Sequence, residues 1–195
     1  MAKRFAYPLR TFLRRTDGSG TVEVVLAIVV LNLFLVAFYF WWGAYNAHAL
    51  VDRTTYTISD LVTRQRGVEL NRRLLDGLDR TAEFILDPDQ DAAIRFTQVT
   101  KEAGQSPGDP GTIRIDWSYS PCNAMPAAQA GPGFDIQTLP MMADGSSLIV
   151  TDMQVPFESE LDLIPSITFE RRAAALYRFE NRFTLVGEGA VTCPG

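Results

Sequence analysis

The sequence predicts an α+β fold in which a long N-terminal transmembrane helix extends into an outer domain of helices packed on a small antiparallel sheet. Three observations carry this prediction. An uncharged apolar stretch occupies residues 24–47, amphipathic helical patterns follow it to residue 86, and alternating patterns typical of strands fill much of the remainder. The expected division is a basic leader at residues 1–18, a transmembrane helix at 19–47 and an α+β domain at 48–195.

The apolar stretch is long enough to cross a membrane. It has no charged residue, and only Asn32, Gly43 and Asn46 fall outside the apolar set. A helix of about 20 such residues spans a hydrocarbon layer of about 30 Å. A buried core helix of this length would rarely lack a charge. The A-x-A pattern at Ala47-His48-Ala49 is typical of the cleavage site of a secretory signal peptide. The apolar region of such a peptide covers only about 7–15 residues, so a cleaved signal peptide is a weaker alternative to a membrane helix.

Charge predicts the orientation of this helix. The leader carries five basic residues and one acid, whereas the chain from Asp52 onward has 21 acids and 13 bases. Cytoplasmic flanks of membrane helices are enriched in Lys and Arg, so we expect a cytoplasmic N-terminus and an acidic domain outside. Aromatic residues that favour the outer interface cluster near the end of the stretch: Tyr39, Trp41, Trp42 and Tyr45. The acidic domain argues against nucleic acid as a partner.

Helical spacing continues beyond the apolar stretch. The expected buried stripe consists of Leu50, Val51, Thr54, Ile58, Leu61, Val62 and Gln65. We expect a break at Gly67 and a second helix over residues 68–86, ended by Asp87-Pro88. Its apolar face comprises Leu74, Leu75, Leu78, Ala82 and Ile85.

Alternation predicts four strands in the remainder. The first contains Ile94 and Phe96, and the second covers residues 113–119 after a Gly- and Pro-containing loop at 104–111. The third is expected at 148–157 and the fourth near 175–186. Cys122 and Cys193 are the only cysteines, and both are expected on the outer, oxidising side. A disulfide between them would close a loop of about 70 residues, which contributes about 4 kcal/mol in the chain-entropy model.

Residues suited to catalysis are scarce. His48 is the only histidine and stands at the end of the apolar stretch, so no Ser-His-Asp, Cys-His or histidine metal site is expected in the outer domain. The acids of residues 87–91 resemble the opening of a calcium loop, but Ala92 and Gln98 occupy positions that need Gly and Glu. We therefore predict no enzyme, no cofactor and no metal. A hydrolase that uses acid pairs such as Glu158, Glu160 and Asp162 is the weakest alternative.

The entry to the apolar stretch has an unusual order of residues. A basic leader ends at Gly18, and a cut after Gly18 would make Ser19 the first mature residue and Glu23 the fifth. This order resembles the substrates of prepilin peptidase, an inner-membrane aspartic protease. A carboxylate at the edge of hydrocarbon is costly unless it has a partner. Alternatively, the Glu23 carboxylate only interacts favourably with the positive end of the helix dipole in the first turn, and Ser19 or Thr21 caps the helix. A second glycine, Gly20, leaves the position of the cut open.

Further segments extend this resemblance. The Gly20-Thr-Val-Glu-Val-Val-Leu26 segment is similar to the start of TadE-like proteins, which are minor pilins or pseudopilins of the bacterial tight-adherence (Tad/Flp, type IVb) pilus. The segments from Ile113, Ser146 and Leu176 are similar to strands of that family's outer domain. Two features differ from the family pattern: Val24 stands where Phe is usual, and the helix lacks a proline that is often present.

The resemblance implies a structural function. It implies a single-pass protein of the bacterial inner membrane, with a cytoplasmic N-terminus and a periplasmic C-terminal domain, that joins or primes a pilus through helix packing. Its partners would be membrane lipid, other pilins or pilus assembly platform proteins, and prepilin peptidase. Asn32 and Gly43 are candidates for helix packing, because polar groups and close approach favour helix association in lipid. The alternative is a permanently anchored periplasmic binding module unrelated to pili.

Overall fold

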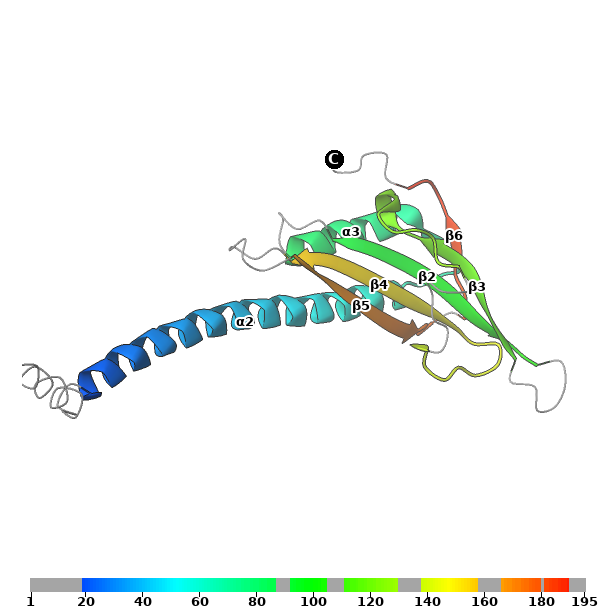
Figure 1. The fold of residues 1–195 in the computed structure, drawn as a ribbon. Coiled ribbons are helices and arrows are strands. Elements are labelled where there is room, and N and C mark those ends of the chain that lie inside the picture. Colours follow the sequence, from blue (N-terminus) through cyan, green and yellow to red (C-terminus); the bar gives the residue numbers. More distant parts are fainter. Residues whose placement is uncertain are drawn as a thin grey trace, which may run out of the picture. The chain divides into compact units, whose positions relative to one another are not determined.

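The computed structural model describes residues 19–86, 92–104, 111–129, 138–157, 166–179 and 181–189 (Figure 1). The elements in chain order are helix α2 (Ser19–Thr63), strand β1 (Glu69–Asn71), helix α3 (Arg72–Leu86), strands β2 (Ala93–Glu102) and β3 (Thr112–Tyr119), the 3-10 turn η1 (Pro121–Asn123), and strands β4 (Ser147–Phe157), β5 (Ile167–Leu176) and β6 (Thr184–Val186). The chain divides into two compact units, Met1–Tyr45 and Asn46–Gly195. A long apolar N-terminal helix, a second helix and a small antiparallel sheet confirm the predicted α+β class.

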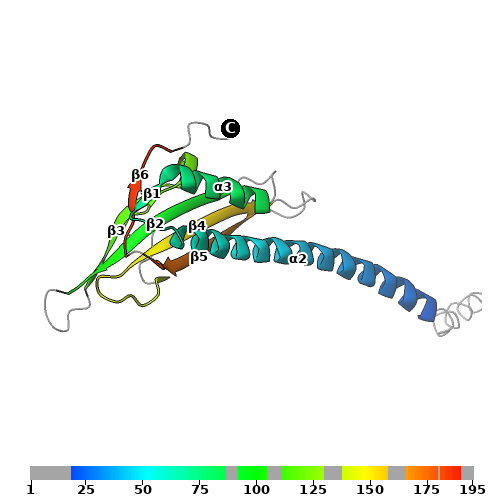
Figure 2. The same ribbon diagram turned by 180° about the vertical axis from the view of Figure 1, so that it is seen from behind.

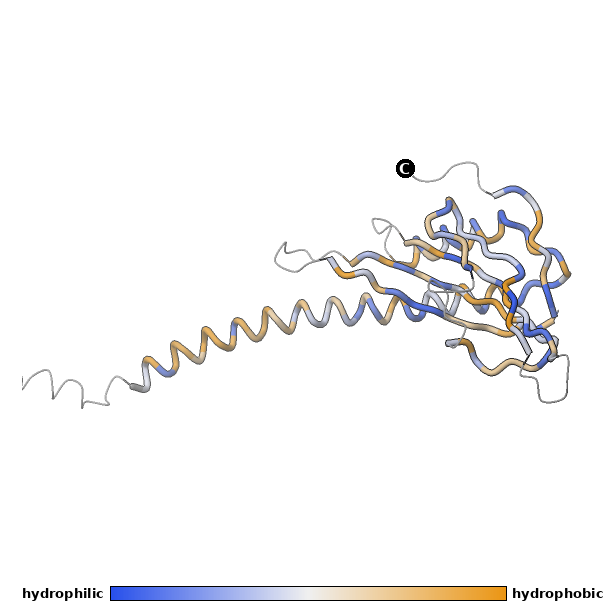
Figure 3. Tube along the Cα trace, turned by 45° about the vertical axis from the view of Figure 1, so that its right-hand side comes forward, coloured by the Kyte–Doolittle hydropathy of each residue, from blue (hydrophilic) through white to orange (hydrophobic). Residues whose placement is uncertain are grey.

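The first unit contains the apolar part of α2. Nearly all of its described side chains are exposed, including Leu33, Phe34 and Trp41. Figure 3 shows apolar positions along this part of the helix. Within the described ranges, α2 is the one helix long and apolar enough to cross a membrane. A helix that is apolar on all sides is stable only when a core or a membrane covers it.

The second unit begins with the remaining turns of α2, residues 46–63, which pack on the sheet. Val51, Ile58 and Val62 are buried as predicted, but Leu61 is 38% exposed. Thr54 is buried as predicted, and the buried face also includes three small polar residues outside the predicted stripe: Thr55, Ser59 and Thr63. The Thr55 hydroxyl donates to the Val51 carbonyl at 2.7 Å, so this hydroxyl keeps a hydrogen bond although its residue is buried.

The second helix starts later than predicted. Residues 69–71 form β1, which pairs in parallel with β6, and α3 begins only at Arg72. The Asn71 side-chain oxygen accepts the Arg73 N–H at 2.9 Å, so Asn71 caps the first turn. Leu75, Leu78 and Ala82 face the core as expected, whereas Ile85 is 39% exposed.

The main sheet has the strand order β3-β2-β4-β5, with antiparallel pairing throughout and a bulge between Gln98 and Val99. The first three predicted strands are confirmed. The fourth was misplaced: β5 covers 167–176, and of the predicted 175–186 segment only 175–176, the end of β5, and 184–186, which form β6, are in strands. The apolar alternation of β5 is interrupted by three consecutive charged residues, Glu170, Arg171 and Arg172. For this reason the sequence pattern did not predict a strand at these positions.

Both helices of the second unit lie on one face of this sheet (Figure 2). The core on that side combines residues of α2, α3, β2 and β4, with Ile58, Leu75, Phe96 and Met153 fully buried. A smaller cluster around Val99, Leu148 and Val150 lies on the opposite face. The chain before β4 contributes Met142 to this cluster, so both faces of the central strands are covered.

A buried amide holds the segment after β5 against the sheet. The Gln98 side chain is inaccessible to solvent and its oxygen accepts the Tyr177 hydroxyl at 2.5 Å and the Phe183 N–H at 2.9 Å. Its nitrogen donates to Asp116 at 2.7 Å. Because each of these groups is satisfied, the polar network fixes the positions of Tyr177 and Phe183 against the sheet.

Candidate functional site

The predicted processing site lies at the beginning of the described chain. Gly18 is outside the described residues, whereas Ser19 is part of α2 and Glu23 is one turn further along the same helix. The Glu23 side chain is exposed, together with the apolar side chains around it. The carboxylate is therefore available to a partner on another chain, and cleavage after Gly18 or Gly20 stays a prediction.

Asn32 and Gly43 both occupy exposed positions on the apolar helix. The Asn32 amide donates to the Ile28 carbonyl at 2.8 Å, so its N–H is partly satisfied within its own helix. A Cβ added at Gly43 would meet nothing within 4 Å, so the glycine leaves a shallow, open position on the helix surface. Such a position allows the close approach of a second helix, and helix packing at both residues remains a prediction.

Several other predicted residues fall on or beside segments that the structure does not describe. Cys122 lies in η1 with a left-handed φ of 52°, directly after β3. Cys193 is outside the described residues, so the disulfide stays a prediction. The acids of residues 87–91 and the acid group Glu158, Glu160 and Asp162 also lie outside them. In the parts of the chain that are described, no group of three or more His, Cys, Asp and Glu residues could hold a metal ion.

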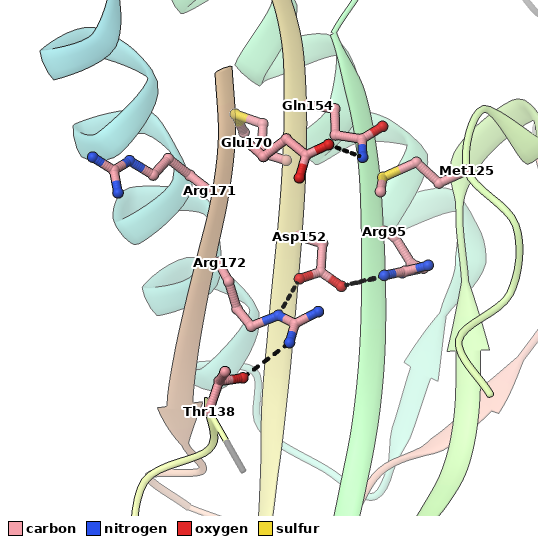
Figure 4. Close-up of a pocket in the computed structure, with 9 residues that line it drawn as sticks. Arg95, Met125, Thr138, Asp152, Gln154, Glu170, Arg171 and Arg172 are labelled. Carbon is pink, nitrogen blue, oxygen red and sulfur yellow. Dashed lines mark hydrogen bonds and ion pairs between the residues drawn. The ribbon is translucent and has the colours of Figure 1, made fainter. Parts of the chain in front are cut away.

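A pocket of about 380 Å³ opens on the sheet face opposite the helices (Figure 4). Strands β2, β4 and β5 supply most of its wall, and the connection between β3 and β4 supplies the rest. Its lining includes Arg95, Met125, Thr138, Asp152, Glu170 and Arg172. Arg171 borders the pocket by its backbone but points to the other side, where it meets α2 (Figure 4).

A row of three charges crosses the floor of this pocket, which we name the Arg-Asp-Arg row: Arg95, Asp152 and Arg172. The three residues are direct cross-strand neighbours on β2, β4 and β5. Arg95 Nη2 donates to Asp152 Oδ2 at 2.7 Å, and Arg172 Nε donates to Asp152 Oδ1 at 2.5 Å. The Arg95 and Asp152 side chains are only 8% exposed. Burial strengthens the attraction, and it makes the loss of either partner costly.

Further hydrogen bonds tie the row to the loop that covers it. Arg95 Nη1 donates to the Pro126 carbonyl at 2.9 Å, and Arg172 Nη1 donates to the Thr138 hydroxyl at 3.0 Å. The row brings together neither a nucleophile with a base nor two closely spaced carboxylates, which are the usual elements of hydrolytic sites. Its geometry is that of an ion-pair network that joins three strands to the β3–β4 connection.

His48 makes specific contacts within the second unit. Its ring packs edge-on against Phe169 of β5, with ring centres 5.4 Å apart, and its Nε2 contacts the Arg171 guanidinium. Arg171 also pairs with Asp52 of α2 at 2.5 Å. The sequence placed His48 at the end of the apolar stretch but gave no sign of these partners, which come from a strand more than 100 residues away.

Acidic residues on α3 interact with the adjoining strand. The Tyr119 hydroxyl donates to Asp76 at 2.7 Å, and burial together with Asp76 raises the Tyr119 pKa. Burial, followed by the nearby charges of Glu83 and Asp76, raises the pKa of Asp79 from 3.8 to about 7. Ionised Asp79 is therefore disfavoured in the folded domain.

Replacing Asp79 with Asn is expected to stabilise the domain at pH 8 by about 1 kcal/mol, a value reduced because the site is partly exposed. The folded pKa is higher than the unfolded one, so wild-type stability falls as the pH rises from about 4 to about 7. The advantage of the variant should disappear at pH 3. Urea unfolding at both pH values measures it, and an equal advantage at both would contradict the assignment.

Comparison with known proteins returns no relative: no protein-family model, no curated protein and no solved structure matches the chain. The functional proposal accordingly rests on the sequence pattern at residues 18–23 and on the separate features of α2 and the sheet domain.

Proposed function

We propose that the protein is a non-catalytic, membrane-anchored minor pilin or pilus assembly protein of the TadE-like kind, which contributes to the biogenesis of a Tad/Flp pilus. The observation that supports this most strongly is helix α2. Residues 19–63 form one continuous helix, apolar on all sides in its first part and packed into the core of a sheet domain in its last turns. One helix thus supplies both a membrane anchor and a core element of the domain.

This arrangement suits a subunit that assembles through its helix. The first part of α2 presents apolar side chains that lipid can cover before assembly and neighbouring helices can cover afterwards. Glu23 then has a role, because its carboxylate can pair with the new amino group at Ser19 of an adjacent subunit after cleavage. The outer domain needs no catalytic group in this function, since it acts through its surface.

Fractionation and protease accessibility test the anchor and its orientation. We expect the full chain to stay in bacterial inner membranes during alkaline carbonate extraction, with the outer domain cleaved by protease added from the periplasmic side. A cytoplasmic enzyme fused at Met1 should be protected in the same membranes. Extraction of the chain by carbonate, or protection of the domain, would contradict the proposal.

The second candidate is a permanently anchored binding module. The pocket above the Arg-Asp-Arg row supports it, because a concave site with several polar side chains is suited to binding a ligand. The row itself, however, is largely occupied by its internal hydrogen bonds. The two candidates differ at the mature N-terminus, which is shortened only in the pilin.

A further inference from the structure

We propose that the last turns of α2, residues 51–63, form a release joint: they separate from the sheet and lose their helical structure while α3 and the sheet stay folded. The inference goes beyond the proposed function, because it concerns only contacts within the second unit. Unfolding would lengthen the joint from about 20 Å as a helix to about 43 Å as an extended chain.

The first observation is the local sequence of the joint. Seven of its 13 residues are β-branched, and only Arg53 and Leu61 belong to the strong helix formers. In α3, by contrast, nine of 15 residues are strong helix formers and two are β-branched. A β-branched side chain loses rotamer freedom against the preceding turn of a helix. The joint is therefore a weak helix by itself and depends on its packing against the sheet.

The second observation is the chemistry of that packing. Thr54 and Ser59 of the joint are at most 2% exposed, and neither hydroxyl has a hydrogen-bond partner within the described chain. On β4, Thr151 lies between the core residues Ile149 and Met153, is fully buried, and likewise has no partner there. A buried hydroxyl without a partner has lost its hydrogen bonds to water. These three groups therefore oppose the docking of the helix on the sheet.

The remaining contacts of the joint are limited. Val51, Ile58 and Val62 are fully buried and hold it on the sheet. The ion pair between Asp60 and Arg178 adds little, because both side chains are more than a third exposed and water screens the pair. α3 buries four apolar side chains in the same core: Leu75, Leu78, Ala82 and Leu86. Local opening begins where the contacts are weakest, so the joint opens before α3.

Amide hydrogen exchange tests the proposal with the full chain in detergent micelles, read by mass spectrometry of peptic fragments. After correction for intrinsic rates, the amides of residues 51–63 should exchange at least about tenfold faster than those of α3 and β4 at neutral pH without denaturant. α3 and β4 should keep their protection while the joint exchanges, because they do not open with it.

Two substitutions of the same kind form a matched pair. Thr54→Val replaces a hydroxyl without a partner by a methyl group of similar size, so it should slow the exchange of residues 51–63 about tenfold. Thr55 is buried almost equally, but its hydroxyl donates to the Val51 carbonyl at 2.7 Å and lies 3.4 Å from Met153 Sδ. Thr55→Val should therefore not slow the exchange. Threonine and valine have similar helix propensities, so this factor is constant in both variants.

Each contrary result overturns the proposal. Exchange of residues 51–63 at the rate of α3 and β4 would show that the joint opens only with the whole domain. Equal slowing by the two valine variants would show that added apolar surface, and not the hydroxyl without a partner, controls the opening. Urea unfolding of each variant checks that the domain is folded. Neither result depends on pilus assembly, so failure of the joint and failure of the proposed function are distinguishable.

Discussion

Replacing Asp152 with Ala is expected to destabilise the outer domain by about 3–5 kcal/mol. The carboxylate lies between the guanidinium groups of Arg95 and Arg172, and both the Arg95 and Asp152 side chains are almost completely buried. Removing it leaves two positive charges close together with their shared partner lost. The measurement is urea unfolding of the full chain in detergent micelles, followed by the fluorescence of Trp117 in proteins in which Trp41 and Trp42 are both replaced with Phe.

An exposed ion pair provides the matched control. Asp144 pairs with Lys101 at 2.9 Å, but its side chain is 54% exposed. Asp144→Ala should cost less than about 1 kcal/mol, because water screens a surface pair and solvates the lysine that remains. Equal losses for Asp144→Ala and Asp152→Ala would show that the Arg-Asp-Arg row does not hold the strands together.

Replacing Glu23 with Leu is expected to leave the chain in the membrane and to lower its association with neighbouring pilin subunits about tenfold. The physical reason is the loss of a pair between the carboxylate and the Ser19 amino group of an adjacent subunit. A pair at the edge of hydrocarbon contributes on the order of 1–2 kcal/mol, and 1.4 kcal/mol corresponds to a factor of ten. The measurement is the yield of photo-crosslinks between subunits in native membranes.

Glu23→Asp is the control for this experiment, because it keeps the negative charge and shortens its reach. It should retain more crosslinking than Glu23→Leu. If Glu23 acts only on the dipole of its own helix, the leucine variant should crosslink like the wild type, since that interaction is worth only about 0.3–1 kcal/mol to helix stability. Unchanged crosslinking of the leucine variant would therefore show that Glu23 has no role in the association of subunits.

Local patterns predicted the elements that depend on neighbouring residues. The apolar composition of residues 24–47 and the helical spacing after it predicted α2 beyond Ala47, and alternation predicted β2, β3 and β4. The start of α3 was missed because β1 exists only through its pairing with β6. Leu70 lies opposite Leu185, more than 100 residues later, and no local pattern records such a pairing.

The Arg-Asp-Arg row was missed for the same reason. Arg95, Asp152 and Arg172 belong to strands that are far apart in the sequence, and only the register of the sheet places them side by side. Isolated charges within apolar strands were the available signal, because a charge on a covered sheet face needs a partner. The same reasoning could have predicted β5. Its three consecutive charges alternate between the two faces of the sheet, and each could have been expected to pair with a charge on its own face.

The N-terminal residue of the membrane-bound protein tests the pilin assignment most directly. The full chain is produced in cells with an active prepilin peptidase, purified from the inner membrane and sequenced from its N-terminus, beside a Gly18→Val variant and cells with an inactive peptidase. The account predicts a wild-type chain that begins at Ser19, and uncleaved chains in both controls. A wild-type chain that still begins at Met1 beside an active peptidase would contradict it and favour the permanently anchored module.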